Sequence, residues 1–177
     1  MSRIRKALTR FLGEEKGTAT IELVLTFPVI MTIFASAFEI GLANVRHVML
    51  ERATDIVVRD LRLNTGAPPS YAEVKRLICT NAAILPDCAN SLKLELRQVS
   101  TASWNWPPND ADCTDRAAPI NPVRSWENGQ QNELMMVRAC AVFDPMFPAF
   151  GLGAMMPKDE TGGYRLVSIS GFVNEPL

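Results

Sequence analysis

An uncharged, apolar run of 16 residues limits the possible folds of this chain more than any other segment: Leu23 to Phe38 (LVLTFPVIMTIFASAF). It extends to Ala43, 21 residues in all, with Glu39 as the only charge. At about 1.5 Å per residue, a helix of that length spans roughly one bilayer hydrocarbon core. Large apolar side chains fall on every face of it, whereas a core helix of a soluble domain has a polar stripe. The run therefore predicts a transmembrane helix over residues 18–43.

The charges on the two sides of this run are unequal. Residues 1–17 contain five basic residues and two Glu, which gives a net charge of +3. The basic residues are Arg3, Arg5, Lys6, Arg10 and Lys16. The chain holds 18 basic and 19 acidic residues in all, which leaves 13 and 17 in the rest, a net charge of −4. Because basic residues near a span stay in the cytoplasm, we expect residues 1–17 inside and residues beyond about 44 outside.

A secretory signal peptide is the alternative interpretation of the same run. Ala35-Ser36-Ala37 has the small-x-small pattern of a cleavage site, and cleavage there would release a secreted protein that begins at Phe38. The apolar run continues past that site, and Glu22 lies at its start. Both facts favour an uncleaved span, but this alternative stays open, as does an ordinary membrane-anchored periplasmic binding module.

The residues just before the run suggest a processing site. Lys16 and Gly17 follow a basic leader, and Glu22 comes five residues after the Gly. This string resembles the processing site of type IV prepilins, which a prepilin peptidase cuts after the Gly on the cytoplasmic face. The resemblance implies cleavage between Gly17 and Thr18. Glu22 would then lie four residues from a new ammonium group on Thr18, on the same helical face.

A longer pattern resembles the TadE-like pilus-assembly family of tight-adherence systems. It consists of Gly17-x-Ala19-x-x-Glu22, then Pro28, then Phe38-Glu39-x-Gly41, and covers about residues 16–62. Ile40, between Glu39 and Gly41, departs from the family pattern. The resemblance implies a pseudopilin or minor pilin of a type IV-like pilus, held in the bacterial inner membrane by one helix. Its expected partners are prepilin peptidase, other pilin-like subunits and the pilus assembly platform.

Three residues within the span have further expected roles. Pro28 removes a helix hydrogen bond and predicts a kink. Glu39 is expected at the outer membrane interface, half solvated, and it and Gly41 form a candidate contact with another assembly subunit. A carboxylate at the edge of an apolar span is costly, so Glu22 is the strongest candidate for subunit register.

The sequence after the span predicts an α+β head. Apolar residues recur at spacings of three and four, which predicts an amphipathic stalk helix over residues 44–66 that docks onto the head: Val45, Val48, Met49, Ala53, Ile56, Val57 and Leu61. Within residues 67–177 we expect a helix from a capping box at Ser70 to about residue 83. Strands are expected over residues 92–97, 134–143 and 164–173, in a small antiparallel sheet. Residues 100–132 and 144–163 are predicted loops.

Four cysteines, all beyond the span, indicate an oxidising compartment and a disulfide-stapled head. They allow three pairings, of which we prefer Cys79–Cys88 and Cys113–Cys140. No CxxC or Cys/His pair has the spacing of a zinc site or a thioredoxin-like site. An envelope thiol enzyme would need a reactive free thiol.

Nothing else in the sequence forms a catalytic, metal or cofactor pattern, and we expect no enzyme activity, no metal and no cofactor. His47 stands alone on the stalk, and the acidic loop residues Asp110, Asp112 and Asp115 are expected to be solvated. The near-neutral charge lacks the clustered basic face that nucleic acid binding needs. Trp104 and Trp106 are expected either to contact a partner or to cover an open sheet edge.

Overall fold

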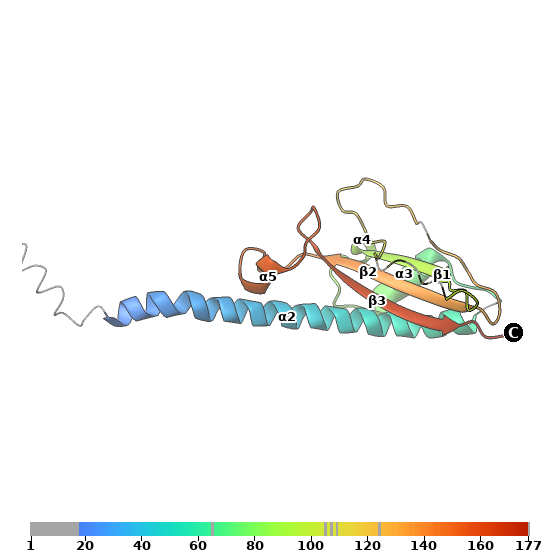
Figure 1. The fold of residues 1–177 in the computed structure, drawn as a ribbon, viewed down its shortest axis with the longest axis horizontal. Helices are drawn as coiled ribbons and strands as arrows, with labels where there is room; N and C mark the ends of the chain where they lie inside the picture. The colour runs from blue at the N-terminus through green and yellow to red at the C-terminus, as the bar shows by residue number, and fades with distance from the viewer. Residues whose placement is uncertain are drawn as a thin grey trace, which may run out of the picture.

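The computed structural model describes residues 18–64, 66–104, 106, 108, 110–123 and 125–176. Figure 1 shows a long helix that projects from a compact head, with the C-terminus at the far end of the head. The basic leader over residues 1–17, including Gly17 of the predicted processing site, lies outside the described residues.

Helix α2 (Thr18–Leu63) is one continuous helix of 46 residues, which joins the predicted span to the predicted stalk. It continues through Pro28 (Figure 1), and the hydroxyl of Thr32 donates a hydrogen bond to the Pro28 carbonyl at 2.7 Å. The helix ends at Leu63, three residues before the predicted end of the stalk at residue 66. Its N-terminal half stands free, and its C-terminal half forms one wall of the head.

The head contains a three-stranded antiparallel sheet in the order β1-β2-β3, formed by β1 (Leu92–Gln98), β2 (Leu134–Phe143) and β3 (Tyr164–Val173). Pairs such as Leu94 with Ala139 and Ala139 with Ser168 fix the register. All three predicted strands are confirmed, and the fold class is α+β as predicted. Helix α3 (Tyr71–Asn81) begins at Ser70, whose hydroxyl accepts a hydrogen bond from the Glu73 N–H. A short helix, α4 (Cys88–Ser91), leads into β1.

The hydrophobic core lies between one face of the sheet and helices α2 and α3. Leucines 92, 94 and 96 of β1 meet alternate residues of β2 and the buried side of α3, Val74 and Ile78. The buried face of α2 differs in part from the prediction: Val45, Val48 and Ile56 are exposed, whereas Leu50 and Val58 are buried with Ala53, Val57 and Leu61. Both sets have helical spacing, so only the position of the sheet distinguishes them.

The opposite face of the sheet is also buried along β1 and β2, although Ile169 of β3 is 58% exposed there, so the first strand is not half-buried as its alternation indicates. Lys93, Glu95 and Arg138 point to this face and are 5%, 4% and 4% exposed. The loop over residues 99–133 covers them, and its Ser125–Glu127 segment borders β1 through a parallel bridge between Trp126 and Leu96. Alternation along β1 therefore separates an apolar layer from a charged layer, both of which exclude solvent.

The connection between β2 and β3 contains a short helix, α5 (Gly151–Met155), where the sequence predicts only loop. Five residues are too few to give a helical period that sequence reasoning can detect. Figure 1 shows this connection beside α2, on the side of the sheet that faces the N-terminal half of the helix.

Both predicted disulfides are present, Cys79–Cys88 and Cys113–Cys140. The first joins α3 to α4. The second joins the loop over residues 99–133 to the buried β2 strand, so it fixes that loop against the charged face of the sheet.

Candidate functional site

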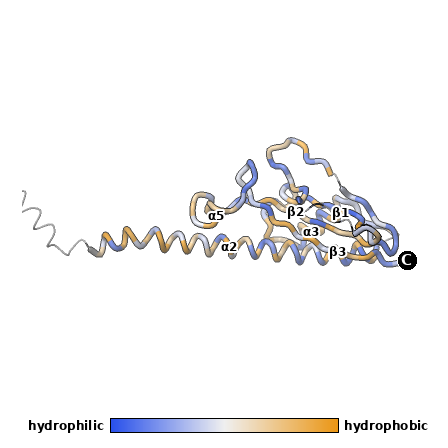
Figure 2. The backbone as a smooth tube through the Cα atoms, viewed as in Figure 1, coloured by the Kyte–Doolittle hydropathy of each residue, from blue (hydrophilic) through white to orange (hydrophobic). Residues whose placement is uncertain are grey.

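The candidate functional site is the N-terminal half of α2, which no other part of the described structure covers except near residues 35–39. Its most apolar 18-residue window has a mean hydropathy of 2.0, the length and composition needed to cross a membrane. Figure 2 shows this half of the helix as largely hydrophobic. Its large side chains are about half or more exposed, among them Leu25 at 69% and Ile33 at 65%. A core helix would be buried, so the helix is compatible with single-pass membrane anchoring.

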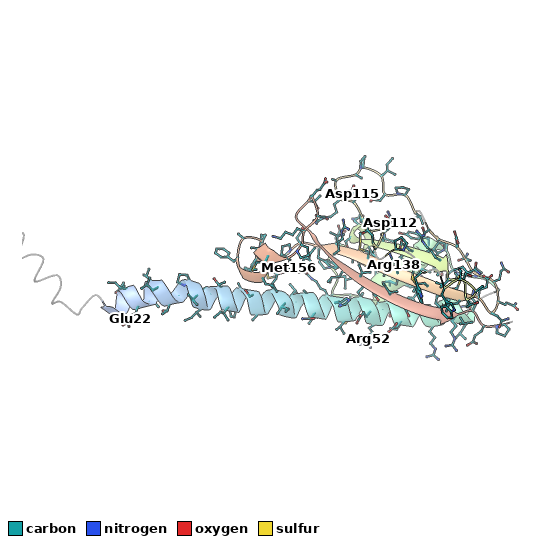
Figure 3. The ribbon with its side chains drawn as sticks, in the orientation of Figure 1. Glu22, Arg52, Asp112, Asp115, Arg138 and Met156 are labelled. Atoms are coloured by element: carbon teal, nitrogen blue, oxygen red, sulfur yellow. A yellow bond between two sulfur atoms is a disulfide. The ribbon has the colours of Figure 1, made fainter. Side chains whose placement is uncertain are left out.

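Glu22 lies near the start of this exposed segment, far from the head (Figure 3). Its backbone carbonyl accepts a hydrogen bond from the Thr26 hydroxyl at 2.7 Å. Its carboxylate has no ion pair or hydrogen bond with any residue that the structure describes. A carboxylate on an otherwise apolar surface needs a partner or water, so Glu22 is available to a group outside this chain. Thr18 is the first residue of α2, four residues before it.

Gly41 lies on an exposed part of the helix, and a Cβ atom added there would meet nothing within 4 Å. Packing within this chain therefore does not require a glycine at this position. The same surface includes Phe38 and Ile40, which are both about half exposed.

Glu39 is fully buried, which corrects the expectation of a half-solvated residue at the membrane interface. The uncharged segment over residues 145–157 (PMFPAFGLGAMMP), here called the apolar loop, folds back against α2 and covers it. The backbone N–H of Phe147 donates a hydrogen bond to Glu39 Oε2 at 2.9 Å. The N–H of Leu152 donates to the Ser36 hydroxyl at 3.1 Å, one turn earlier on the helix. The Phe147 ring also packs edge-on against Phe38, at 6.2 Å between centroids.

Two glycines allow this close approach. A Cβ atom on Gly151, whose φ is +51°, would lie 2.2 Å from the Ser36 hydroxyl. A Cβ atom on Gly153 would lie 2.5 Å from the carbonyl oxygen of Phe147 and 3.3 Å from Glu39 Oε2. Larger residues at either position would push the apolar loop away from the helix.

Charged groups border the apolar loop on the side of the sheet. Asp144 pairs with Arg116 at 2.8 Å, and Lys158 donates a hydrogen bond to the Pro148 carbonyl at 3.1 Å. Asp159 closes the return turn by accepting hydrogen bonds from Thr161 and from the Gly163 N–H. Burial alone would raise the pKa of Asp159, but these hydrogen bonds and the nearby Arg116 together lower it below 3.8.

The buried charges on the outer face of the sheet have internal partners and form no open site. Arg138 donates hydrogen bonds at 3.0 Å to the carbonyls of Pro108 and Asp110 and lies 3.3 Å from Glu95. Lys93 pairs with Asp112 at 2.9 Å, so Asp112 is a structural partner of a buried lysine and not a solvated charge. Figure 3 shows Arg138 and Asp112 inside the head, away from the free half of α2. These groups attach the loop to the sheet.

The remaining candidate residues from the sequence have separate surroundings. The His47 Nε2 atom lies 3.1 Å from the Val167 carbonyl oxygen of β3 and 3.6 Å from the Glu51 carboxylate of α2, so the ring contacts both elements. Trp104 and Trp106 are both more than half exposed and do not cover the sheet edge; Trp126, which the sequence did not single out, borders it and packs against Tyr71.

Both disulfides are closed, so none of the four cysteines has a free thiol. In the part of the chain that the structure describes, no group of three or more His, Cys, Asp or Glu residues has the arrangement of a metal site.

Sequence reasoning identified the exposed helix and Glu22, but it missed the apolar loop and its contacts with Ser36 and Glu39. One signal was present: thirteen residues without a charge, rich in Phe, Met and Gly, in a connection between two strands. Such a run in a solvent-facing loop is unusual and indicates a contact.

Comparison with known protein families matches residues 17–59 to the family described as TadE-like protein. This match confirms the resemblance drawn from Gly17, Glu22, Pro28 and Gly41, over nearly the same range. It covers the whole free half of α2 and most of the half that packs on the head. No curated protein and no solved structure matches the chain.

Proposed function

From the TadE-like match over residues 17–59, we propose that this chain is a non-enzymatic pseudopilin or minor pilin that serves biogenesis of a tight-adherence pilus. The observation that carries the proposal is a single continuous helix with two different halves. The first half is apolar, exposed and bears Glu22, whereas the second half belongs to the core of a compact head. Such a subunit can leave the membrane and pack its helix among others while its head stays folded.

The proposed mechanism begins with cleavage between Gly17 and Thr18 by prepilin peptidase on the cytoplasmic face of the inner membrane. Cleavage removes the leader, with its net charge of +3, and creates an ammonium group on Thr18. The Glu22 carboxylate then pairs with the ammonium group of an adjacent subunit. In hydrocarbon an unpaired charge is costly, so such a pair favours one axial register between helices.

The partners proposed for the free half of α2 are other pilin-like subunits and the pilus assembly platform. Gly41 has open space around it, which allows another helix to approach closely. A bend at Pro28 would adapt the helix to its neighbours. The head is proposed to lie in the periplasm, where its disulfides form, and in the fibre or at its base after assembly.

The experiment that tests this proposal is determination of the mature N-terminus, by sequencing and intact mass, in cells with and without prepilin peptidase. We expect a chain that begins at Thr18 only when the peptidase is present. An intact Met1 in both strains would indicate an anchored periplasmic module instead. A chain that begins at Phe38 would indicate a secreted protein released by signal peptidase.

A substitution at Glu22 tests the assembly step separately. We expect Glu22→Ala to be processed at Gly17 but to be absent from sheared pili, because the subunit ammonium group loses its partner. Asp55→Ala is the matched control: Asp55 is an exposed carboxylate on the same helix, beyond the predicted span, and this variant should assemble normally. Normal incorporation of Glu22→Ala would contradict the register role while leaving the processing result intact.

A further inference from the structure

The apolar loop, residues 145–157, presents large apolar side chains to the outside although it is part of the head. Phe150 is 63% exposed and Met155 is 81% exposed, and Met146 is also more than half exposed. No charged residue interrupts the loop, and charges reappear at both of its ends, at Asp144 and Lys158. A patch of this kind on a soluble surface marks a contact with an apolar partner.

The position of the apolar loop along α2 indicates what that partner is. The loop is fixed at Ser36 and Glu39, inside the 21-residue segment predicted to span the membrane. Arg46 is the first basic residue after that segment, and these two anchor residues lie seven and ten residues before it. At the helical rise, the loop therefore contacts α2 about 10–15 Å closer to the bilayer centre than Arg46, below the headgroup region. Figure 1 shows the same arrangement, with α5 beside α2 on the side of its free half.

The backbone of the apolar loop is also suited to an environment that lacks water. Irregular backbone at membrane depth is tolerated only where its polar groups have partners within the protein. Phe147 and Leu152 donate their N–H groups to α2, while other N–H groups bond within the loop: those of Phe150, Ala154 and Met156. Pro145, Pro148 and Pro157 have no N–H group to satisfy.

We propose that the apolar loop inserts into the acyl-chain region of the outer leaflet of the inner membrane, below the headgroups, with Met146, Phe150 and Met155 in contact with lipid. Arg46, which donates a hydrogen bond to the Tyr164 hydroxyl at 2.9 Å, then lies on the headgroup side of the loop. The loop and α2 together form a two-point attachment that fixes the rotation and height of the head on the membrane. This inference rests on the membrane anchoring included in the proposed function, but it does not depend on cleavage or on pilus assembly.

The test uses the full chain reconstituted in vesicles of phosphatidylcholine and phosphatidylglycerol. The four native cysteines are closed in disulfides, so a single added cysteine can be labelled selectively with an environment-sensitive NBD fluorophore. Met155→Cys reports on the apolar loop, and Met146→Cys provides a second position in it. Ile120→Cys is the matched control, because Ile120 is 76% exposed in a different loop. Ile33→Cys, on the exposed part of α2, reports on membrane anchoring.

We expect the labels at positions 155 and 146 to have blue-shifted emission, to be quenched by lipids with a shallow nitroxide, and to be protected from aqueous iodide. The label at position 120 should have unshifted emission, should not be quenched by nitroxide lipids, and should be quenched by aqueous iodide. The label at position 33 should be quenched by a deep nitroxide.

Two results would overturn the inference, and they differ in what they mean for the proposed function. If position 33 is quenched by lipid but positions 155 and 146 are quenched by iodide, α2 spans the bilayer and only loop insertion is wrong. Protection of these positions that then appears only in assembled pili would assign the loop to a contact between subunits. If position 33 is also reached by iodide, membrane anchoring fails and the inference fails with it.

Discussion

At the scale of single residues, two glutamates on the same helix have opposite surroundings. Glu22 is exposed among apolar side chains and has no partner among the described residues, whereas Glu39 is fully buried and accepts a hydrogen bond from the Phe147 N–H. A carboxylate near hydrocarbon is stable only when a donor or counter-charge satisfies it. The chain gives Glu39 Oε2 a donor and leaves the buried Oε1 without one among the described residues, whereas Glu22 is the carboxylate that another molecule can reach.

Substitution of Glu39 should detach the apolar loop. Glu39→Leu leaves the buried Phe147 N–H without an acceptor, which costs about 1–3 kcal/mol. Glu39→Gln is the matched variant, because its side-chain carbonyl can accept the same hydrogen bond. We expect faster amide exchange at Phe147 and faster proteolysis within residues 144–163 for Glu39→Leu in detergent micelles, and little change for Glu39→Gln. Equal protection of the loop in both variants would contradict the anchoring role of this hydrogen bond.

At the scale of elements, the two faces of the sheet are stabilised differently. The face toward α2 and α3 is apolar, so its burial requires only side chains that fit together in shape and volume. The other face carries Lys93, Glu95 and Arg138. The loop over residues 99–133 supplies a carboxylate partner to Lys93 and carbonyl partners to Arg138, and Arg138 in turn lies 3.3 Å from Glu95. The Cys113–Cys140 disulfide holds that loop in place, whereas Cys79–Cys88 only joins two neighbouring helices.

The two disulfides should therefore contribute unequally to stability. The sequence separations are 27 and 9 residues, for which the loop-entropy relation gives about 3.6 and about 2.6 kcal/mol. Loss of the longer bridge also weakens the cover over Arg138. We expect the Cys113→Ala, Cys140→Ala variant to unfold at a lower denaturant concentration than the Cys79→Ala, Cys88→Ala variant, as measured by circular dichroism in detergent. If the variant without Cys79–Cys88 unfolds at the lower denaturant concentration, the position of the loop over residues 99–133 does not depend on the Cys113–Cys140 disulfide.

At the scale of the whole molecule, the structure separates an apolar rod from a folded head, as Figures 1 and 2 show. The apolar loop extends from the head toward the rod, so the transition between the two lies around residues 36–46 of α2. Net charge changes sign across the span, from +3 in the leader to −4 in the rest of the chain. The distribution of Lys and Arg governs insertion, so the leader is expected to orient the molecule.

Reporter fusions test that orientation. Alkaline phosphatase joined after Pro176 should be active if the head is exported as predicted, and β-galactosidase at the same place should be inactive. Replacing the leader's basic residues with Gln should reduce phosphatase activity and raise that of β-galactosidase: Arg3, Arg5, Lys6, Arg10 and Lys16. The comparison variant replaces Arg52 and Arg59, which lie beyond the span, and should keep the original orientation. A head found in the cytoplasm with the leader intact would contradict the predicted topology.

The sequence by itself determined the features that depend on local periodicity and composition. Sixteen uncharged residues imply a helix that water does not favour, and strict alternation over residues 92–97 implies a strand, because these patterns follow from the geometry of each element alone. The capping box at Ser70 is local in the same sense. The preferred cysteine pairing was correct as well, since one pair is only nine residues apart and leaves the other two cysteines to each other.

Only the tertiary structure decided which of several equivalent surfaces is covered. The spacing of apolar residues on α2 fits two overlapping faces, and contact with β3 selected Leu50 and Val58 over Val48 and Ile56. The charges of β1 are those of a solvent-facing strand, yet the loop that follows it, over residues 99–133, folds back and buries them. Glu39 reads as interfacial until residues 145–157, more than one hundred positions later, donate an N–H to it. Burial depends on contacts between distant segments, and no local pattern in either segment encodes the other.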